Sequence, residues 1–135
     1  MYSIFTDTSA WYAYMDKDDA GDNSAVNVIR NLSRPLITSN YIFDEIMTLA
    51  KLRLGFDVAA TFGEKLWSQE IAGLVRVTAQ DEAEAWKIFL KFKDKGFSFT
   101  DCTSFAIMER LCISEAFTLD SHFSQYGQFA IIPSA

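Results

Sequence analysis

Basic residues are scarce in this chain. Its 135 residues include 12 Lys and Arg against 18 Asp and Glu, which gives a formal net charge of -6. Nonspecific binding of nucleic acid relies on Lys and Arg side chains that neutralise phosphates. The composition therefore excludes a protein that coats nucleic acid through its overall charge. It does not exclude an enzyme that acts on nucleic acid through a metal ion and a local basic patch.

Cysteine and histidine are also rare, with two Cys and one His. Cys102 and Cys112 are expected on one helix, where ten residues at a rise of 1.5 Å each separate them by about 15 Å. A disulfide needs Cα atoms within about 7 Å of each other. No bridge is therefore expected, and a reducing, cytoplasmic location fits. The single His and the two distant Cys also give little support for a zinc site.

Long apolar runs are missing. None approaches the roughly 20 residues of a membrane span, and Asp7 interrupts the first apolar stretch too early for a secretory signal. Half of the residues are nevertheless hydrophobic, which is enough for a buried core. A chain of this length is close to the common size of one domain, so residues 1–135 are predicted to form a single domain.

Short apolar stretches alternate with longer stretches of helical periodicity. Strands are expected over residues 2–6, 36–38, 74–77, 116–119 and 129–132, and helices over residues 10–15, 24–32, 40–54, 56–69, 80–93 and 101–111. The alternation predicts an α/β fold with a central, mostly parallel sheet that is flanked by helices on both sides. In the helix over residues 80–93, the spacing of Ala83, Trp86, Phe89 and Leu90 predicts that these side chains face the core.

Asp7 follows the first predicted strand directly. The carboxyl end of a parallel strand borders the crevice in which open α/β sheets bind their ligands. A carboxylate buried there needs a hydrogen-bond donor, a positive charge or a metal ion. Asp is also a good helix N-cap, so Asp7 taken alone is equally consistent with a capping role for the next helix.

Three further carboxylates occupy comparable positions. Glu45 lies beside the apolar stripe of its helix, whereas Asp44 lies on the opposite face. Asp101 is in the first turn of its helix on the apolar side, and Asp120 follows a strand as Asp7 does. The simpler alternatives are a solvent-exposed Glu45 and, for Asp101, a favourable charge at a helix N-terminus.

Asp7, Glu45, Asp101 and Asp120 are expected to gather at one edge of the sheet. Clustered carboxylates repel one another unless a cation lies among them. Oxygen ligands of this kind favour Mg²⁺ or Mn²⁺, with water in the remaining positions. Such an ion suits phosphoryl transfer, because it activates water and neutralises charge on a phosphate. The four acids are therefore the candidate metal ligands and catalytic residues.

The same residues resemble the motifs of the PIN domain family, and in particular the VapC-type toxins of bacterial toxin–antitoxin pairs. The resemblance begins with Asp7 and the two hydroxyl residues after it. It continues through residues 39–45, 99–106 and 119–123, which carry the other three acids. It spans residues 2 to 132, and four motifs in this order are more specific than any one of them.

The resemblance implies a PIN fold and a metal-dependent endoribonuclease that cuts single-stranded or loop RNA with a metal-activated water. It also implies a homodimer and a cognate antitoxin protein. Ser104 stands where some members carry a further acid, which favours one tightly bound metal ion over two. His122 is expected to be an ordinary loop or surface residue, with a general acid as the alternative.

Two other functions fit parts of the sequence. A phosphatase with Asp7 as nucleophile usually has a second Asp where Ser9 stands, and a Lys near the last carboxylate that is missing after Asp120. A non-catalytic partner-binding module with the PIN fold would not need the four acids that this chain keeps. In the nuclease interpretation, Lys87, Lys91 and Arg53 would assist phosphate binding if they faced the acidic edge.

Overall fold

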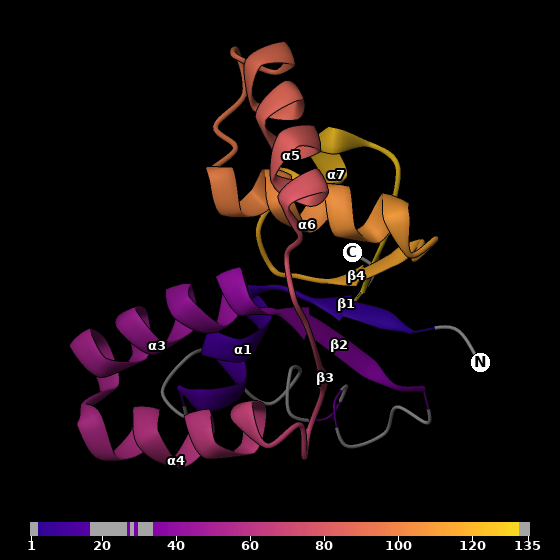
Figure 1. Ribbon diagram of the computed structural model, residues 1–135. Coiled ribbons are helices and arrows are strands. Elements are labelled where there is room, and N and C mark those ends of the chain that lie inside the picture. Colours follow the sequence, from indigo (N-terminus) through magenta and orange to yellow (C-terminus); the bar gives the residue numbers. More distant parts are fainter. Residues whose placement is uncertain (1–2, 17–26, 28, 30–33, 133–135) are drawn as a thin grey trace.

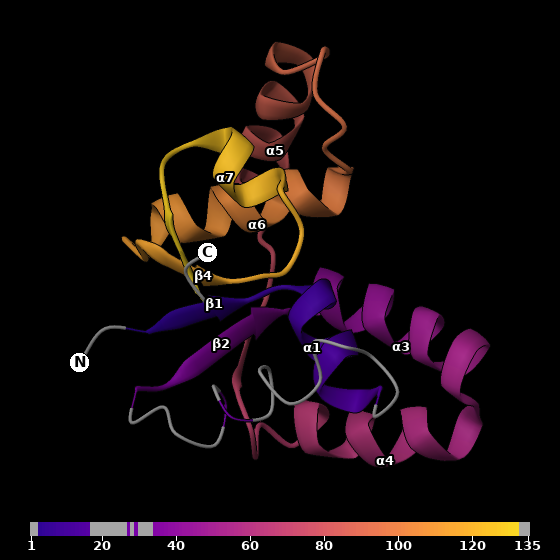
Figure 2. The same ribbon diagram turned by 180° about the vertical axis from the view of Figure 1, so that it is seen from behind.

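The computed structural model describes residues 3–16, 27, 29 and 34–132 (Figure 1, Figure 2). One sheet contains the strands β1 (Ile4–Thr6), β2 (Leu36–Ser39), β3 (Gly73–Val75), β4 (Glu115–Phe117) and β5 (Ala130–Ile132). The strands lie in the order β3-β2-β1-β4-β5, and every neighbouring pair is parallel. The predicted α/β fold with a parallel central sheet is confirmed.

Helices cover both faces of the sheet (Figure 1, Figure 2). The helices on one side are α1 (Thr8–Met15), α3 (Asn40–Leu54) and α4 (Phe56–Trp67), and those on the other are α5 (Ala79–Lys91), α6 (Phe99–Arg110) and α7 (His122–Tyr126). Helix α3 packs against α4, and α5 packs against α6. The short helix α7 was not expected from the sequence, because five residues are too few to show a helical period.

Polar side chains cap the starts of α3, α5 and α6. Ser39 caps α3, since its hydroxyl accepts a hydrogen bond from the backbone N–H of Ile42 at 3.1 Å. The side chain of the next residue, Asn40, accepts a hydrogen bond from the backbone N–H of Val77 at 2.7 Å. This contact ties the start of α3 to the chain that leaves β3. Thr78 caps α5 within a capping box.

The core lies between the sheet and its two helical layers. The largest fully buried side chains are Trp11, Phe5, Phe105, Phe117 and Phe123. All three residues of β1 are buried, so this strand is covered on both faces. The chain that leaves β1 continues inside the molecule, since Asp7 is also buried.

The prediction of which side of α5 faces the core is wrong. Trp86 is 54% exposed, whereas Ala85 and Ile88 are buried. The reason is the buried carboxylate of Asp81, which pairs with the guanidinium of Arg110 on α6 at 2.8 Å. This ion pair turns the side of α5 that carries Asp81 toward α6, and the aromatic side turns outward.

The two cysteines do not share one helix, although both were expected on it. Helix α6 ends at Arg110, so Cys112 lies beyond it, with a left-handed φ of 56°. Both cysteines are free, as predicted.

The helix expected over residues 24–32 lies outside the described residues, apart from Asn27 and Ile29. Within the described parts of the chain, no helix combines the length and apolar character needed to cross a membrane.

Candidate metal centre

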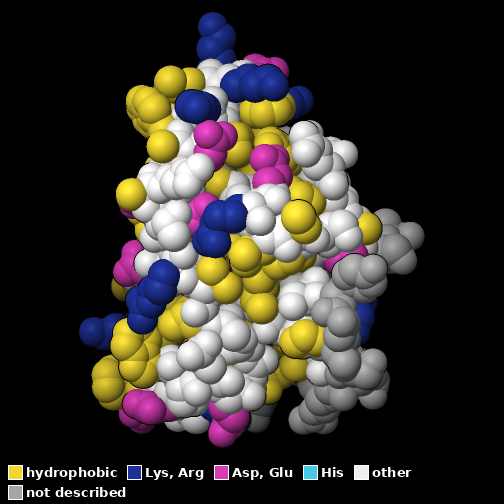
Figure 3. Space-filling view, turned by 45° about the vertical axis from the view of Figure 1, so that its right-hand side comes forward, with side chains coloured by type: hydrophobic (Ala, Val, Ile, Leu, Met, Phe, Trp, Pro, Cys, Tyr) yellow, Lys and Arg dark blue, Asp and Glu magenta, His cyan; other side chains and the backbone are white. Residues whose placement is uncertain are grey.

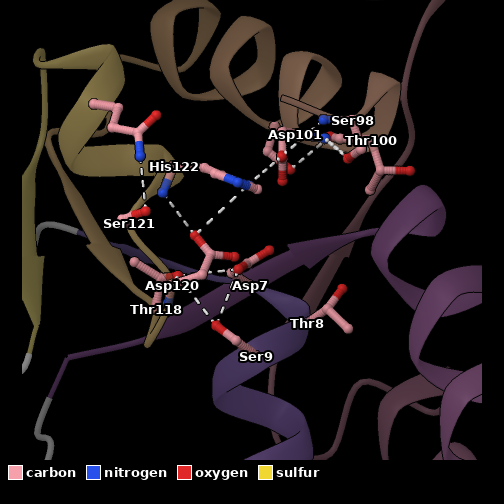
Figure 4. A network of polar contacts seen from close by, with 12 residues as sticks. Asp7, Thr8, Ser9, Ser98, Thr100, Asp101, Thr118, Asp120, Ser121 and His122 are labelled. Atoms are coloured by element: carbon pink, nitrogen blue, oxygen red, sulfur yellow. Dashed lines mark hydrogen bonds and ion pairs between the residues drawn. The ribbon is translucent and has the colours of Figure 1, made fainter. Parts of the chain in front are cut away.

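The carboxyl edge of the sheet gathers acidic side chains from separate parts of the chain (Figure 4). Asp7 follows β1, and Asp120 follows β4, which is the strand next to β1. Asp101 is in the first turn of α6, and Glu45 is on α3. The pairing of parallel strands thus brings chain segments together that are more than 100 residues apart.

Asp7 is 2% exposed and stands at the N-cap position of α1, but its side chain makes no capping hydrogen bond. Its Oδ2 instead accepts hydrogen bonds from Ser9 Oγ at 3.1 Å and Thr118 Oγ1 at 3.0 Å (Figure 4). Burial, and then the negative charges of Asp120 and Asp101, raise the pKa of Asp7 to about 8. The side chain therefore does not serve as a cap, and its carboxyl group stands in an environment that lacks positive charge.

Asp101 closes the capping box of α6. Its backbone N–H donates to Ser98 Oγ at 3.0 Å, and its Oδ2 accepts from the backbone N–H of Ser98 at 2.9 Å. The same Oδ2 lies 2.7 Å from Nδ1 of His122. Burial raises the pKa of Asp101 above its usual value. The carboxylate therefore has a capping role and also faces the acidic edge.

Asp120 and His122 complete a compact group. Oδ1 of Asp120 accepts a hydrogen bond from the backbone N–H of His122 at 2.9 Å. One donor atom each from Asp101, Asp120 and His122 lies within 4.8 Å of the others. The expectation of an ordinary loop residue at position 122 is wrong, because His122 begins α7 and its ring lies in the site (Figure 4). The sequence signal was the short spacing of two residues between Asp120 and His122.

Glu45 approaches from α3. Its Oε1 accepts a hydrogen bond from the hydroxyl of Thr8, the residue directly after Asp7. Glu45 is half-buried and Asp44 is exposed, as predicted. Glu45 is therefore linked to the edge through Thr8, although its carboxylate is not part of the compact group of Asp101, Asp120 and His122.

The donor set fits a hard divalent cation. Its carboxylates come from four separate segments of the chain. Burial, and then the neighbouring negative charges, raise the pKa of Asp7, so a cation at this edge would relieve both effects. Among the described residues, the buried Nδ1 of His122 has no hydrogen-bond partner. Oxygen donors with one imidazole suit Mg²⁺ or Mn²⁺ better than the thiolate-rich sets of structural zinc sites. The residues present thus fit a divalent metal ion.

Arg53 and Lys87, two of the basic residues considered for phosphate binding, make their contacts elsewhere. Arg53 is in the last turn of α3, thirteen residues or about 20 Å along the helix from its start, and its guanidinium lies over the ring of Tyr12. Lys87 pairs with Glu84 at 3.2 Å on the exposed side of α5. On the face seen in Figure 3, Lys and Arg side chains are scattered among hydrophobic and acidic ones. Arg53 and Lys87 are therefore unsuited to hold a phosphate at the acidic edge.

A family model of the PIN domain matches residues 4–128 of the chain. The chain belongs to the PIN domain family. The matched region contains all four predicted acids of this PIN domain. Ser104, which stands where some members have a further acid, donates its hydroxyl to the backbone carbonyl of Thr100 at 3.1 Å inside α6.

This PIN domain is similar to the 23S rRNA-specific endonuclease VapC20 of Mycobacterium tuberculosis strain H37Rv. The two are 32% identical over 130 residues, which cover 96% of this chain and 98% of the relative. The crystal structure of Mycobacterium tuberculosis VapC20, a Sarcin-Ricin loop cleaving toxin, matches with a TM-score of 0.89 and 31% identity over 96% of this chain and 99% of that one. DNA-bound VapBC from Salmonella typhimurium matches over 97% of both chains with a TM-score of 0.70 at 16% identity, and so shares the fold. The comparisons confirm the predicted resemblance to VapC-type toxins.

Proposed function

We propose that this PIN domain is a divalent-metal-dependent endoribonuclease and the toxin of a toxin–antitoxin pair, and that residues 1–135 act as one domain. The observation that carries the proposal is the convergence of Asp7, Asp101 and Asp120 at one edge of the sheet, where burial and mutual repulsion raise the pKa of Asp7 to about 8. The 32% identity to a 23S rRNA-specific endonuclease supports RNA as the substrate.

Asp7, Glu45, Asp101 and Asp120 would hold the ion, which is Mg²⁺ or Mn²⁺. When bound, such an ion polarises a phosphoryl oxygen and lowers the pKa of water. Without a cation, the four carboxylates repel the phosphates of RNA. The reaction is the hydrolysis of a phosphodiester bond, and it leaves a 5′-phosphate and a 3′-hydroxyl.

Hydroxyl groups orient two of these carboxylates. Ser9 and Thr118 donate to Oδ2 of Asp7, and Thr8 donates to Oε1 of Glu45. Each contact fixes the plane of a carboxyl group before the ion arrives, and this reduces the ordering that binding requires. Asp7 releases its proton when the cation binds, because the pKa of about 8 applies to the site without a cation.

The substrate class is an exposed loop of large-subunit ribosomal RNA. This choice rests on the relative that is described as a Sarcin-Ricin loop cleaving toxin, with which the chain shares 31% identity over 96% of its length. A loop presents an accessible phosphodiester bond and unpaired bases, whereas an acidic protein with scattered Lys and Arg gains little from a long duplex.

The proposed partners are a second copy of the chain and a cognate antitoxin in the cytoplasm. Helices α3 and α4 expose large apolar side chains, namely Leu52 at 80%, Phe56 at 65% and Trp67 at 56%. Leu52 and Phe56 flank the turn between the two helices. Exposed large apolar side chains at neighbouring positions are typical of protein-binding surfaces, and we assign this hairpin to the antitoxin. Light scattering at micromolar concentration is expected to find a dimer, and a monomer would contradict the homodimer.

The Asp-nucleophile phosphatase fits less well. The sequence after Asp120 lacks the Lys that this chemistry usually has near its last carboxylate. Ser9 donates its hydroxyl to Asp7 and so replaces the second carboxyl group that this chemistry uses.

Cleavage of a sarcin–ricin loop hairpin tests the proposal. The purified chain is incubated with Mn²⁺ and either this hairpin or a hairpin of the same stem with a permuted loop. We expect cleavage of the first at one position, no cleavage of the second, and no activity in Asp7→Asn. Equal cleavage of both hairpins would contradict the substrate assignment. If the chain cleaved neither hairpin and no other RNA, the endoribonuclease proposal itself would be contradicted.

A further inference from the structure

The ring of His122 adds a nitrogen atom to an edge that otherwise offers oxygen atoms. Its Nδ1 lies 2.7 Å from Oδ2 of Asp101 and 4.0 Å from Oδ1 of Asp120. Donor atoms that share one octahedral ion at 2.0–2.1 Å lie about 3 Å apart when adjacent and about 4 Å apart when opposite. The two separations are therefore close to those of atoms that share one ion.

Nδ1 of His122 is buried and lies against the carboxylate of Asp101. Nδ1 and Oδ2 of Asp101 are 2.7 Å apart, but among the described residues Nδ1 makes no hydrogen bond with the alignment that an N–H···O bond requires. A cation held between Nδ1 and Oδ2 would contact both atoms.

The orientation of the ring is set by contacts that need no ion. The backbone N–H of His122 donates to Oδ1 of Asp120 at 2.9 Å. The ring packs edge-to-face against Phe97, with 5.8 Å between centroids and 71° between planes. Phe97 itself is buried, so it forms a fixed wall behind the imidazole. Nδ1 is therefore held at the acidic edge before any ligand binds.

We propose that Nδ1 of His122 is a direct ligand of the divalent ion, and that it biases the site toward Mn²⁺ over Mg²⁺. This inference rests on the metal centre of the proposed function and adds a nitrogen ligand to its carboxylates. Mg²⁺ prefers oxygen donors, whereas transition-metal ions gain more from an imidazole. His122 thereby sets which ion the site selects, while the carboxylates supply most of the charge.

Pulsed electron paramagnetic resonance of bound Mn²⁺ tests the ligand directly. The chain has one His, so in protein without an affinity tag an imidazole ¹⁴N coupling to Mn²⁺ can come only from His122. We expect this coupling in the wild type and its loss in His122→Phe and His122→Asn. The first variant keeps a ring against Phe97, and the second keeps a polar side chain, so a folding defect in one leaves the other informative.

Calorimetric titration of the same proteins with Mn²⁺ and with Mg²⁺ tests the selectivity. Loss of a ligand is expected to weaken Mn²⁺ binding by at least about tenfold, and to weaken Mg²⁺ binding clearly less. Mn²⁺ binding to the wild type without ¹⁴N coupling would overturn the ligand role and leave the endoribonuclease proposal intact. An equal loss of affinity for both ions would overturn the selectivity, since His122 would then only position Asp101. Failure of the wild type to bind Mn²⁺ at all would overturn the metal centre itself.

Discussion

The hydroxyl of Thr118 donates a hydrogen bond to Oδ2 of Asp7 over 3.0 Å, although 111 residues separate the two in the chain. The parallel pairing of β1 with β4 creates this contact, because Thr6 lies opposite Phe117, and Asp7 and Thr118 are the next residues after the two strands. Both side chains are 2% exposed. The donor lowers the pKa of Asp7, but burial outweighs it.

Thr118→Val removes this donor and keeps the shape of the side chain. The free energy of unfolding is expected to fall by about 1–2 kcal/mol, because a buried hydrogen bond to Asp7 is lost. Mn²⁺ binding is expected to weaken as well, because the carboxyl group of Asp7 loses one of the contacts that orient it. Urea unfolding measures the first effect, and calorimetric titration the second.

Thr6→Val is the matched control on the neighbouring strand. The hydroxyl of Thr6 is buried and has no hydrogen-bond partner in the described chain. Its removal is expected to leave stability unchanged or to raise it by up to about 1 kcal/mol. If both Val variants destabilised the protein equally, the cause would be packing, and the role given to Thr118 would be wrong.

Stability without divalent ions is expected to fall as the pH rises. Burial raises the pKa of Asp7 from 3.8 to about 8, so the folded state binds this proton more tightly than the unfolded state. The resulting stabilisation is complete below about pH 4 and is lost as the pH rises through about 8. Asp101, whose pKa is also raised by burial, acts in the same direction.

Urea unfolding in EDTA at pH 5 and pH 8 measures this effect. Asp7→Asn keeps the shape of the side chain and cannot ionise. The variant is expected to be more stable than the wild type at pH 8 by at least about 1 kcal/mol, with a smaller difference at pH 5. A variant that is less stable than the wild type at pH 8 would mean that the charge of Asp7 is already compensated.

Glu45→Gln is expected to lower RNA cleavage by about tenfold or more, because the side chain keeps its contact with Thr8 but loses its charge. Asp44→Asn, the same kind of change one residue earlier on the exposed face of α3, is expected to retain full activity. Initial cleavage rates at saturating Mn²⁺ compare the two. Similar losses in both variants would point to an effect on the whole helix and not on the site.

Lys substitutions at Leu52 and Phe56 are expected to abolish copurification of the antitoxin without loss of RNA cleavage. The two apolar side chains are 80% and 65% exposed on the α3–α4 hairpin, so a charge there does not disturb the core but does weaken an apolar interface. Trp86→Lys is the control, because Trp86 is similarly exposed at 54% on the other side of the sheet. If only Trp86→Lys failed to copurify with the antitoxin, the antitoxin would bind α5 and not the α3–α4 hairpin.

Much of the candidate site was predictable because it follows from topology. Asp7 and Asp120 end apolar strands, and parallel strands collect such residues at one edge. The convergence of Asp101 followed from its position in the first turn of a helix and on the apolar side. These predictions needed only the order of the elements and the direction of the strands.

Contacts between distant side chains were not predictable in the same way. The period of α5 was compatible with an inward face at Trp86, and the choice was decided by the pair of Asp81 with Arg110, which lies 29 residues further along the chain. His122 was missed because its role depends on the turn after β4, which brings the ring to Asp101. A hydrophobic pattern in the sequence contains no information about such pairs.

The most direct test of a metal-dependent hydrolysis at Asp7 is an analysis of the RNA ends produced with and without divalent ions. We expect no cleavage in EDTA, and recovery with Mn²⁺ or Mg²⁺ in the wild type but not in Asp7→Asn. The products should carry a 5′-phosphate and a 3′-hydroxyl, because attack by water does not need the 2′-hydroxyl as nucleophile. Full cleavage in EDTA, or products that end in a 2′,3′-cyclic phosphate, would contradict this chemistry.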